Sequence, residues 1–244
     1  ENFKEKYPKY PDLPVTLTPD NIKNEIEKVL KELIRGNDES RTEKTLNFLY
    51  SLKLLDKNLY INCYHSPYAK IILDYLNNDS EKNSQKNKKG VSKEKIFGLL
   101  QSKPFGLQEE LIYLILIILV YNGRVKLKDD RDIIISASNL DKYFSTEFTT
   151  LFSSSEVFAK LEKIDRIILE KDYPVKKIKE TFQLLDLNTK LLEEKQQQAE
   201  ALRRFRLKTQ KIKEKIESCY SYLKTLGEKD SSYINMKSLL KKGN

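Results

Sequence analysis

The side chains of this chain with the clearest chemical potential are basic, and the first cluster of them lies on a strand-like run. Alternate positions of that run and the turn after it carry Arg124, Lys126, Lys128 and Arg131. Because successive side chains of a strand point to opposite faces, the three strand cations share one face. That face could lie along a phosphate backbone. It could also be an ordinary solvated face, partly balanced by Asp129, Asp130 and Asp132.

A second, denser basic cluster lies near the C-terminus, where a single acid, Glu214, interrupts it. Its members are Arg203, Arg204, Arg206, Lys208, Lys211, Lys213 and Lys215. Four of them recur at four-three-four spacing and so share one helix face, namely Arg204, Lys208, Lys211 and Lys215. This stripe could bind a nucleic-acid backbone or an acidic partner. The alternative interpretation is the charged exterior of a coiled coil.

Residue patterns for other kinds of chemistry are missing from the sequence. Phosphate-binding loops need closely spaced glycines, and the seven glycines of this chain are scattered. His65 is the sole histidine, and the nearby Cys63 cannot complete a tetrahedral metal site with it. No nucleophile stands with a base and an orienting group. We therefore expect a protein that is not an enzyme and that uses neither cofactor nor metal.

The elements expected to position the first cluster form a winged-helix unit. Residues 103–136 read KPFGLQEELIYLILIILVYNGRVKLKDDRDIIIS: a turn, a helix ended by Gly123, and two strands around a tight turn. A helix that reads bases needs an exposed polar face. Leu111–Tyr121 is instead apolar or aromatic without interruption. Exposing it would cost on the order of 1.5–3 kcal/mol per large side chain, so we expect it in the core.

Four regions are expected along the chain, which is predicted to be mainly α. Residues 1–77 form a helical unit, with helices near 18–36, 40–52 and 66–76 and a short strand at 59–64. One interpretation of this unit is a degenerate winged helix. Residues 78–91 are a flexible polar loop. Residues 92–145 are the winged-helix unit. Residues 146–244 are a helical hairpin or coiled-coil arm, with helices near 155–172, from 174, and over 189–226.

The last helix carries a seven-residue pattern that predicts a coiled-coil-like seam. Its positions are Leu191, Lys195, Gln198, Leu202, Phe205, Thr209, Ile212, Ile216, Cys219, Leu223 and Leu226. One interpretation is homo-oligomerisation through Leu202, Phe205, Ile212, Ile216 and Leu223. The other is an antiparallel hairpin within the chain, with residues 155–172 or 175–185 as the partner.

Composition indicates a helical protein that stays in the cytoplasm. The chain is 39% hydrophobic and 33% charged, with few Gly and Pro. Its apolar run of 11 residues is shorter than the roughly 20 that span a bilayer, and no signal peptide is evident. Two cysteines form no disulfide framework. The net charge of +9 is uneven, with 17 basic and 9 acidic residues over 174–244 but 9 and 12 over 105–173.

The order of these elements resembles a region of the large P-loop ATPases of bacterial phage-defence islands, such as the bacteriophage-exclusion (BREX) systems. The similar features are the YPKYP lead-in at residues 7–11 and the KPFGLQEELIYLILIILVYNGRV block, followed by the wing and coiled-coil stretch. The resemblance covers roughly residues 7 to 215. It implies a nucleotide-binding core elsewhere in a longer protein, because this chain has no Walker motif. The first residue, Glu1, is also not a Met. This is expected for an excised piece of a longer protein, and equally for a chain that has been processed.

Together these patterns predict a non-enzymatic scaffold or interaction module from a larger DNA-associated machine. The alternative is a protein that binds DNA without sequence preference, using the wing and the basic C-terminal helix. The two differ in salt dependence, because phosphate contacts weaken steeply as salt rises.

Overall fold

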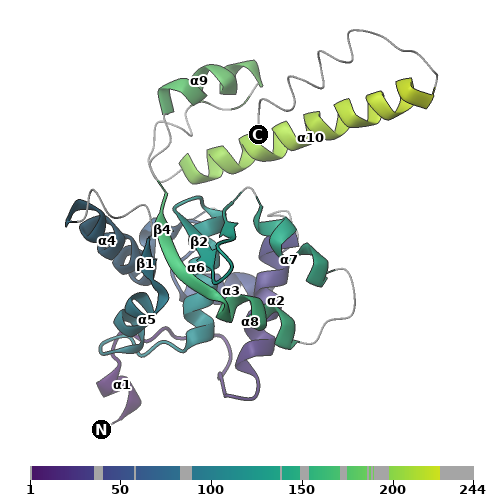
Figure 1. Cartoon of the computed structure of the whole chain (residues 1–244). Coiled ribbons are helices and arrows are strands. Elements are labelled where there is room, and N and C mark those ends of the chain that lie inside the picture. The colour runs from purple at the N-terminus through teal and green to yellow at the C-terminus, as the bar shows by residue number, and fades with distance from the viewer. Residues whose placement is uncertain are drawn as a thin grey trace. The chain divides into compact units, whose positions relative to one another are not determined.

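The structure, a computed structural model, is mainly α with one small sheet (Figure 1). It describes residues 2–35, 41–57, 59–82, 90–137, 139–148, 154–170, 175–185, 187, 189 and 198–225. Contacts divide the chain into two compact units, residues 1–173 and residues 174–244. Among the described residues, no helix is long and apolar enough to cross a membrane.

Helices make up most of the first unit. Their bounds are α1 Phe3–Lys6, α2 Ile22–Arg35, α3 Glu43–Ser51, the 3-10 turn η2 Cys63–His65, α4 Pro67–Lys82, α5 Lys93–Gln101, α6 Glu109–Tyr121, α7 Leu140–Phe148 and α8 Ser154–Glu162. Local capping explains several of their starts. The Thr42 hydroxyl accepts a hydrogen bond from Thr45 N at the start of α3. Pro67 occupies the first position of α4, where its missing N–H costs nothing.

Two sequence predictions in this half of the chain are wrong. The polar loop expected from residue 78 begins later, because α4 continues to Lys82. Polarity alone does not end a helix, and no Gly or Pro follows until Gly90, so the packed turns of α4 propagate. The strand expected at 59–64 is reduced to one isolated bridge between Leu55 and Ile61, followed by η2.

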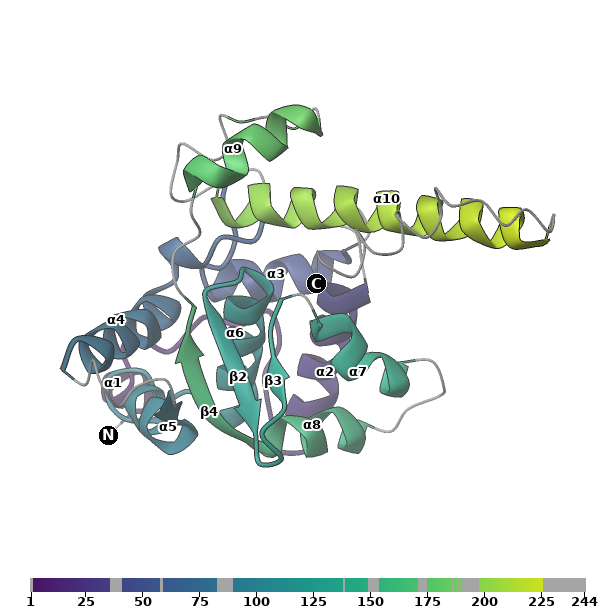
Figure 2. The ribbon, with the colours of Figure 1, turned by 45° about the horizontal axis from the view of Figure 1, so that its top comes forward.

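The four strands form an antiparallel sheet in the order β1-β4-β2-β3. Their bounds are β1 Val91–Ser92, β2 Val125–Asp129, β3 Ile134–Ile135 and β4 Ile164–Leu169. β4 is an interior strand that pairs with both β1 and β2. Figure 1 shows β4 between β1 and β2, and Figure 2 shows it beside β2. Val91 faces Ile167 in one pairing, and Leu127 faces the same Ile167 in the other.

The interior strand overturns the prediction of one continuous helix over residues 155–172. α8 ends at Glu162, and the chain re-enters the sheet as β4. The apolar spacing of Ile164, Ile167 and Ile168 fits either a helix or a half-buried strand. Isoleucine is β-branched and therefore favours strands, and hydrogen bonding to two neighbouring strands stabilises this segment as part of the sheet. Residues 146–173 therefore complete the first unit rather than beginning a helical arm.

Helix α6 lies at the centre of the first unit's core, as its composition predicts. Every side chain from Leu111 to Val120 is buried. It contacts α2, α4, α5 and β2, and Figure 2 shows the sheet lying across it. The Tyr113 ring packs edge-to-face against Phe97, with centroids 5.0 Å apart, and its hydroxyl accepts a hydrogen bond from Lys93 Nζ at 3.3 Å. Burial raises the pKa of the Tyr113 hydroxyl.

In the second unit, α9 Val175–Leu184 packs against the first half of α10 Gln198–Thr225. Phe182 and Phe205 stack with ring centroids 5.5 Å apart, and Phe182 and Ala201 are buried. Residues 175–185 thus supply an intramolecular partner for this part of the seam, as one of the two interpretations expects. The seam residues Leu191, Lys195 and Leu226 lie outside the described residues.

Gly90 should tolerate substitution much less than Gly98 does. Gly90 has φ +73°, and an added Cβ would lie 2.7 Å from the Ile167 carbonyl oxygen of β4. Gly90→Ala is therefore expected to lower the free energy of unfolding by about 1–3 kcal/mol. Gly98 lies in α5 with nothing within 4 Å of an added Cβ, so Gly98→Ala should stabilise by roughly 0.5–1 kcal/mol. Urea denaturation measures both, and equal effects would contradict this view of the Gly90 turn.

Candidate functional site

The first basic cluster lies where the sequence places it, on β2 and the turn after it. Val125 and Leu127 are fully buried, while Lys126 and Lys128 are half-buried on the opposite face, so the predicted alternation is confirmed. Arg124 directly precedes the strand, and its guanidinium lies 5.2 Å from the centre of the Tyr64 ring.

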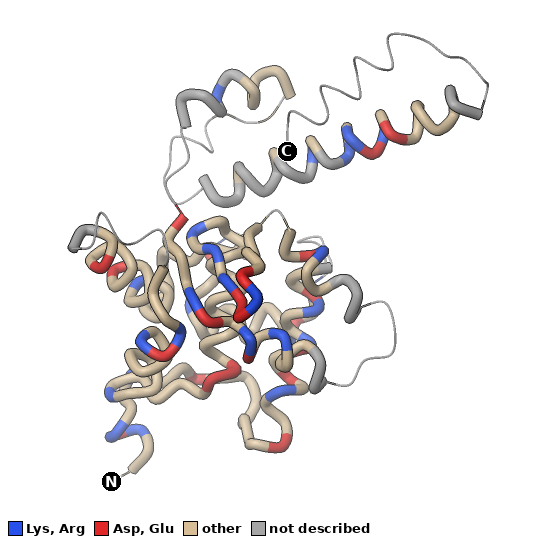
Figure 3. The backbone as a smooth tube through the Cα atoms, viewed as in Figure 1, with Lys and Arg blue, Asp and Glu red and all other residues tan. Residues whose placement is uncertain are grey.

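Each cation of this cluster has a partner within the chain. Lys126 Nζ lies 2.9 Å from Glu170 Oε1, and Lys128 Nζ pairs with Asp132. Exposed pairs of this kind contribute only about 0–1 kcal/mol, so a phosphate could compete for one cation. The sum of charges is the stronger argument. Four basic residues stand among four acids (Asp129, Asp130, Asp132 and Glu170), and Figure 3 shows both signs interspersed along β2 and its turn.

Asp129 organises the turn between β2 and β3. Its carboxylate is buried and accepts hydrogen bonds from Arg131 N at 3.0 Å and Ile133 N at 2.8 Å. The Arg131 guanidinium donates to the same carboxylate from Nη2 at 2.9 Å and from Nε at 3.2 Å. Burial opposes ionisation of Asp129, but the hydrogen bonds from Ile133 and Arg131 outweigh it and lower its pKa. Arg131 thus belongs to the internal structure of the turn.

The second basic cluster lies on α10, and the structure describes part of it. Lys211 and Lys215 are exposed, Lys208 and Lys213 are half-buried, and Lys208 Nζ donates to the Leu185 carbonyl oxygen at the end of α9. The side chains of Arg203, Arg204 and Arg206 lie outside the described residues. Over residues 208–217 of α10, four lysines stand with two acids, Glu214 and Glu217, so this stretch, unlike β2 and its turn, carries a net positive charge.

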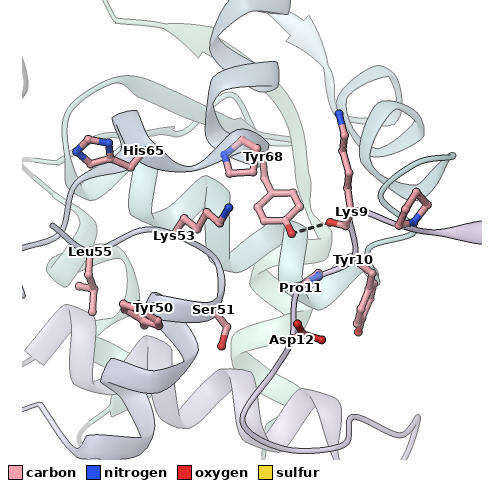
Figure 4. Close-up of a pocket in the computed structure, with 12 residues that line it drawn as sticks. Lys9, Tyr10, Pro11, Asp12, Tyr50, Ser51, Lys53, Leu55, His65 and Tyr68 are labelled. Carbon is pink, nitrogen blue, oxygen red and sulfur yellow. Dashed lines mark hydrogen bonds between the residues drawn. The ribbon is translucent and has the colours of Figure 1, made fainter. Parts of the chain in front are cut away.

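A pocket that the sequence does not indicate opens between the N-terminal segment, the end of α3 and the start of α4 (Figure 4). Its volume is about 750 Å³, within the range of small-molecule sites. Tyr68 closes one side, and its hydroxyl donates to the Lys9 carbonyl oxygen at 2.8 Å. Half of the lining residues are Tyr or Pro, and three are basic. The lining consists of Pro8, Lys9, Tyr10, Pro11, Asp12, Tyr50, Ser51, Lys53, Leu55, His65, Pro67 and Tyr68.

The pocket brings together residues that the sequence separates by more than 50 positions. The Tyr-Pro pairs at residues 7–8 and 10–11 suggest only an extended lead-in, and Ser66-Pro67 suggests only a helix start. Nothing local indicates that these segments meet. Among its described side chains no hydrogen bond joins two ionisable groups, and the Asp12 carboxylate lies 3.5 Å from Lys4 rather than near a pocket base. In the described part of the pocket, no two ionisable side chains are therefore paired for proton transfer.

Cys63 and His65, which the sequence places two residues apart, differ in their burial. Cys63 is fully buried, and burial raises the pKa of its thiol, which keeps it protonated and unreactive. His65 is exposed at the pocket. Among the described residues, no group of three potential metal ligands comes together.

Comparison with known proteins identifies a family but no characterised relative. Residues 22–159, more than half of the chain, match the fourth domain of a family of unknown function (DUF6079). No curated protein gives a significant match, and no solved structure does either. The matched stretch runs from the first residue of α2 into α8, and so includes α6, β2 and β3. The chain therefore belongs to the DUF6079 family, and its residues 22–159 correspond to the fourth domain.

Proposed function

We propose that this chain is a non-enzymatic interaction module within a larger protein. The observation that carries the proposal is the burial of α6 over all ten residues from Leu111 to Val120. A helix with no exposed side chain along this stretch has no groups with which to read base edges. The description of the matched family as a fourth domain supports a place in a longer polypeptide.

We interpret α5, α6 and the sheet as a winged-helix unit that serves as architecture. In this interpretation α5 and α6 are the helix-turn-helix, β2 leads into the wing, and β4 fills the place of the closing strand after an insertion that contains α7 and α8. The resemblance to phage-defence ATPases supports a role for the module in a cytoplasmic, DNA-associated machine, and the nucleotide-binding core of that machine would lie elsewhere. The neutral charge balance around β2 supports architecture over phosphate contact.

A direct, sequence-tolerant DNA-binding role is the second candidate. The observation that favours it is the exposed positive charge of α10, where Lys211 and Lys215 lie on one helix face without an ion pair among the described residues. This role requires no contribution from α6. It predicts binding that depends on charge rather than on base sequence.

A fluorescence-anisotropy titration with labelled duplex DNA separates the two roles. For the interaction module we expect no saturable binding at either about 50 or about 200 mM salt. The DNA-binding role instead predicts binding at the lower salt that weakens by about a hundredfold at the higher, for roughly four phosphate contacts. The control replaces Arg203, Arg204, Lys208 and Lys211 with Ala. Low-salt binding that this variant loses would overturn the proposal.

A further inference from the structure

The second half of α10 carries an apolar stripe formed by Ile212, Ile216 and Cys219. These residues alternate at four-three spacing and so lie along one side of the helix. Ile212 keeps 38% of its surface exposed, and Cys219 is an exposed free thiol. The first half of the same seam is covered by α9 through Phe182, but the seam continues beyond that contact. An apolar seam left open to water favours a further helix as its cover.

The charges that flank this stripe determine which charges a helix packed against it must carry. With Ile216 at heptad position a and Ile212 and Cys219 at position d, the flanking positions e and g hold Lys208, Lys213 and Lys215. Glu214 and Glu217 fall at positions f and b, on the outer side of the helix. Across residues 208–217, the flanks of the seam are therefore uniformly basic.

A second copy of this chain fits these flanks badly. In a two-stranded coiled coil, the e and g residues of one helix lie opposite those of the other. Parallel pairing of two copies would set Lys208 against Lys213, and antiparallel pairing would likewise set Lys against Lys. Like charges at such positions oppose association. Repulsion between these lysines therefore disfavours homo-oligomerisation through Ile212 and Ile216.

Duplex DNA also fits the stripe less well than a helix does. Phosphates would be drawn to Lys211 as much as to Lys215, because both side chains are exposed. They would leave Ile212 and Cys219 uncovered by any apolar contact. A helix with acidic flanks satisfies both features, because its seam buries the isoleucines while its carboxylates meet Lys213 and Lys215 on either side.

We infer that the second half of α10 docks an amphipathic helix of a partner protein, with an apolar seam flanked by Asp or Glu. This inference rests on the proposed role as an interaction module and names the chemistry of its partner. The docking is a two-stranded helical pairing along Ile212, Ile216 and Cys219. Lys213 and Lys215 select the partner, while Lys211, at outer position c, does not take part.

The test uses the full chain and a labelled synthetic peptide of about four heptads with Leu at a and d and Glu at e and g. Fluorescence anisotropy should show saturable binding. K213E and K215E should each weaken it by about fivefold to tenfold, because each replaces an attraction by a repulsion. The matched control is K211E, which changes the net charge equally but should alter affinity by less than about twofold. Circular dichroism confirms that each variant keeps its helix.

Three results would overturn the inference. Equal losses for K211E and K215E would indicate general electrostatic attraction, and absence of peptide binding would remove the site. A dimer in light scattering that oxidation cross-links through Cys219 would assign the seam to a second copy. The duplex-DNA titration keeps the two proposals apart. DNA binding overturns the interaction module itself, whereas failure of the peptide without DNA binding overturns only the acidic-helix partner.

Discussion

Single replacement of Leu114, Ile115 or Leu116 by Ala is expected to lower the free energy of unfolding by about 2–5 kcal/mol in each case. All three side chains are fully buried. Consecutive helix positions point about 100° apart, so these three sample more than half of the circumference of α6. Each truncation removes apolar contacts and leaves a cavity in a core that cannot fully collapse around it.

The comparison with an exposed position makes this prediction specific to α6. Ile133→Ala is the control at an exposed position, because 41% of the Ile133 surface is exposed in the β2–β3 turn. This replacement should change the free energy of unfolding by less than about 0.5 kcal/mol. Urea denaturation followed by circular dichroism gives all four values. A DNA-reading helix would tolerate at least one of the three α6 replacements. One tolerant position would therefore refute α6 as a helix buried on all sides.

Replacing Asp129 by Asn is expected to destabilise the protein by about 1–3 kcal/mol at neutral pH. The buried carboxylate satisfies the backbone N–H groups of Arg131 and Ile133 and holds the Arg131 guanidinium. An amide is neutral and has one acceptor oxygen, so at least one of these donors loses its partner. The control is Asp130→Asn in the same turn, whose side chain is 57% exposed and should matter by less than about 0.5 kcal/mol.

The effect of Asp129 should also depend on pH in a defined direction. Its pKa is lowered in the folded state, so the folded protein binds this proton less readily than the unfolded chain does. The stabilisation is therefore complete above the unfolded value of about 3.9 and is lost as the pH falls through the folded value. Urea denaturation at pH 7 and near pH 3 should show the gap between the protein and Asp129→Asn shrinking. A gap that widens on acidification would contradict this role.

If both predictions hold, α6 and the β2–β3 hairpin are the structural centre of the first unit rather than elements that read DNA bases. α6 would hold the first unit together, and the Asp129 turn would fix the hairpin that packs over it. Binding would then depend on surfaces away from this centre. The described surfaces with that potential are the pocket beside Tyr68 and the second half of α10.

Most helices could be predicted from the sequence because their signals are local. Pro67 marks the start of α4, and Gly123, with φ +64°, follows the end of α6. The unbroken apolar run of α6 requires burial whatever packs around it. Alternation along β2 likewise places Val125 and Leu127 inside without reference to any partner strand.

Predictions failed where the outcome depends on partners that are distant in sequence. Residues 164–169 carry an apolar spacing compatible with helix or strand, and only pairing with β1 and β2 decides between them. The pairing of Lys126 likewise depends on a distant segment, because its partner Glu170 directly follows β4. The pocket forms because the N-terminal segment lies against α4, where the Tyr68 hydroxyl donates a hydrogen bond to the Lys9 carbonyl oxygen. No local sequence pattern predicts this contact.

By itself, the sequence determined that α6 must be buried, that β2 alternates, and that the excess positive charge lies toward the C-terminus. These follow from the type and spacing of neighbouring residues, which hydrophobic burial and backbone geometry translate directly into local structure. Only the tertiary structure decided that residues 164–169 enter the sheet, that the β2 cations are paired, and that a pocket forms beside Tyr68. Each of these depends on contacts between segments far apart in the chain, whose energies appear only once the fold brings them together.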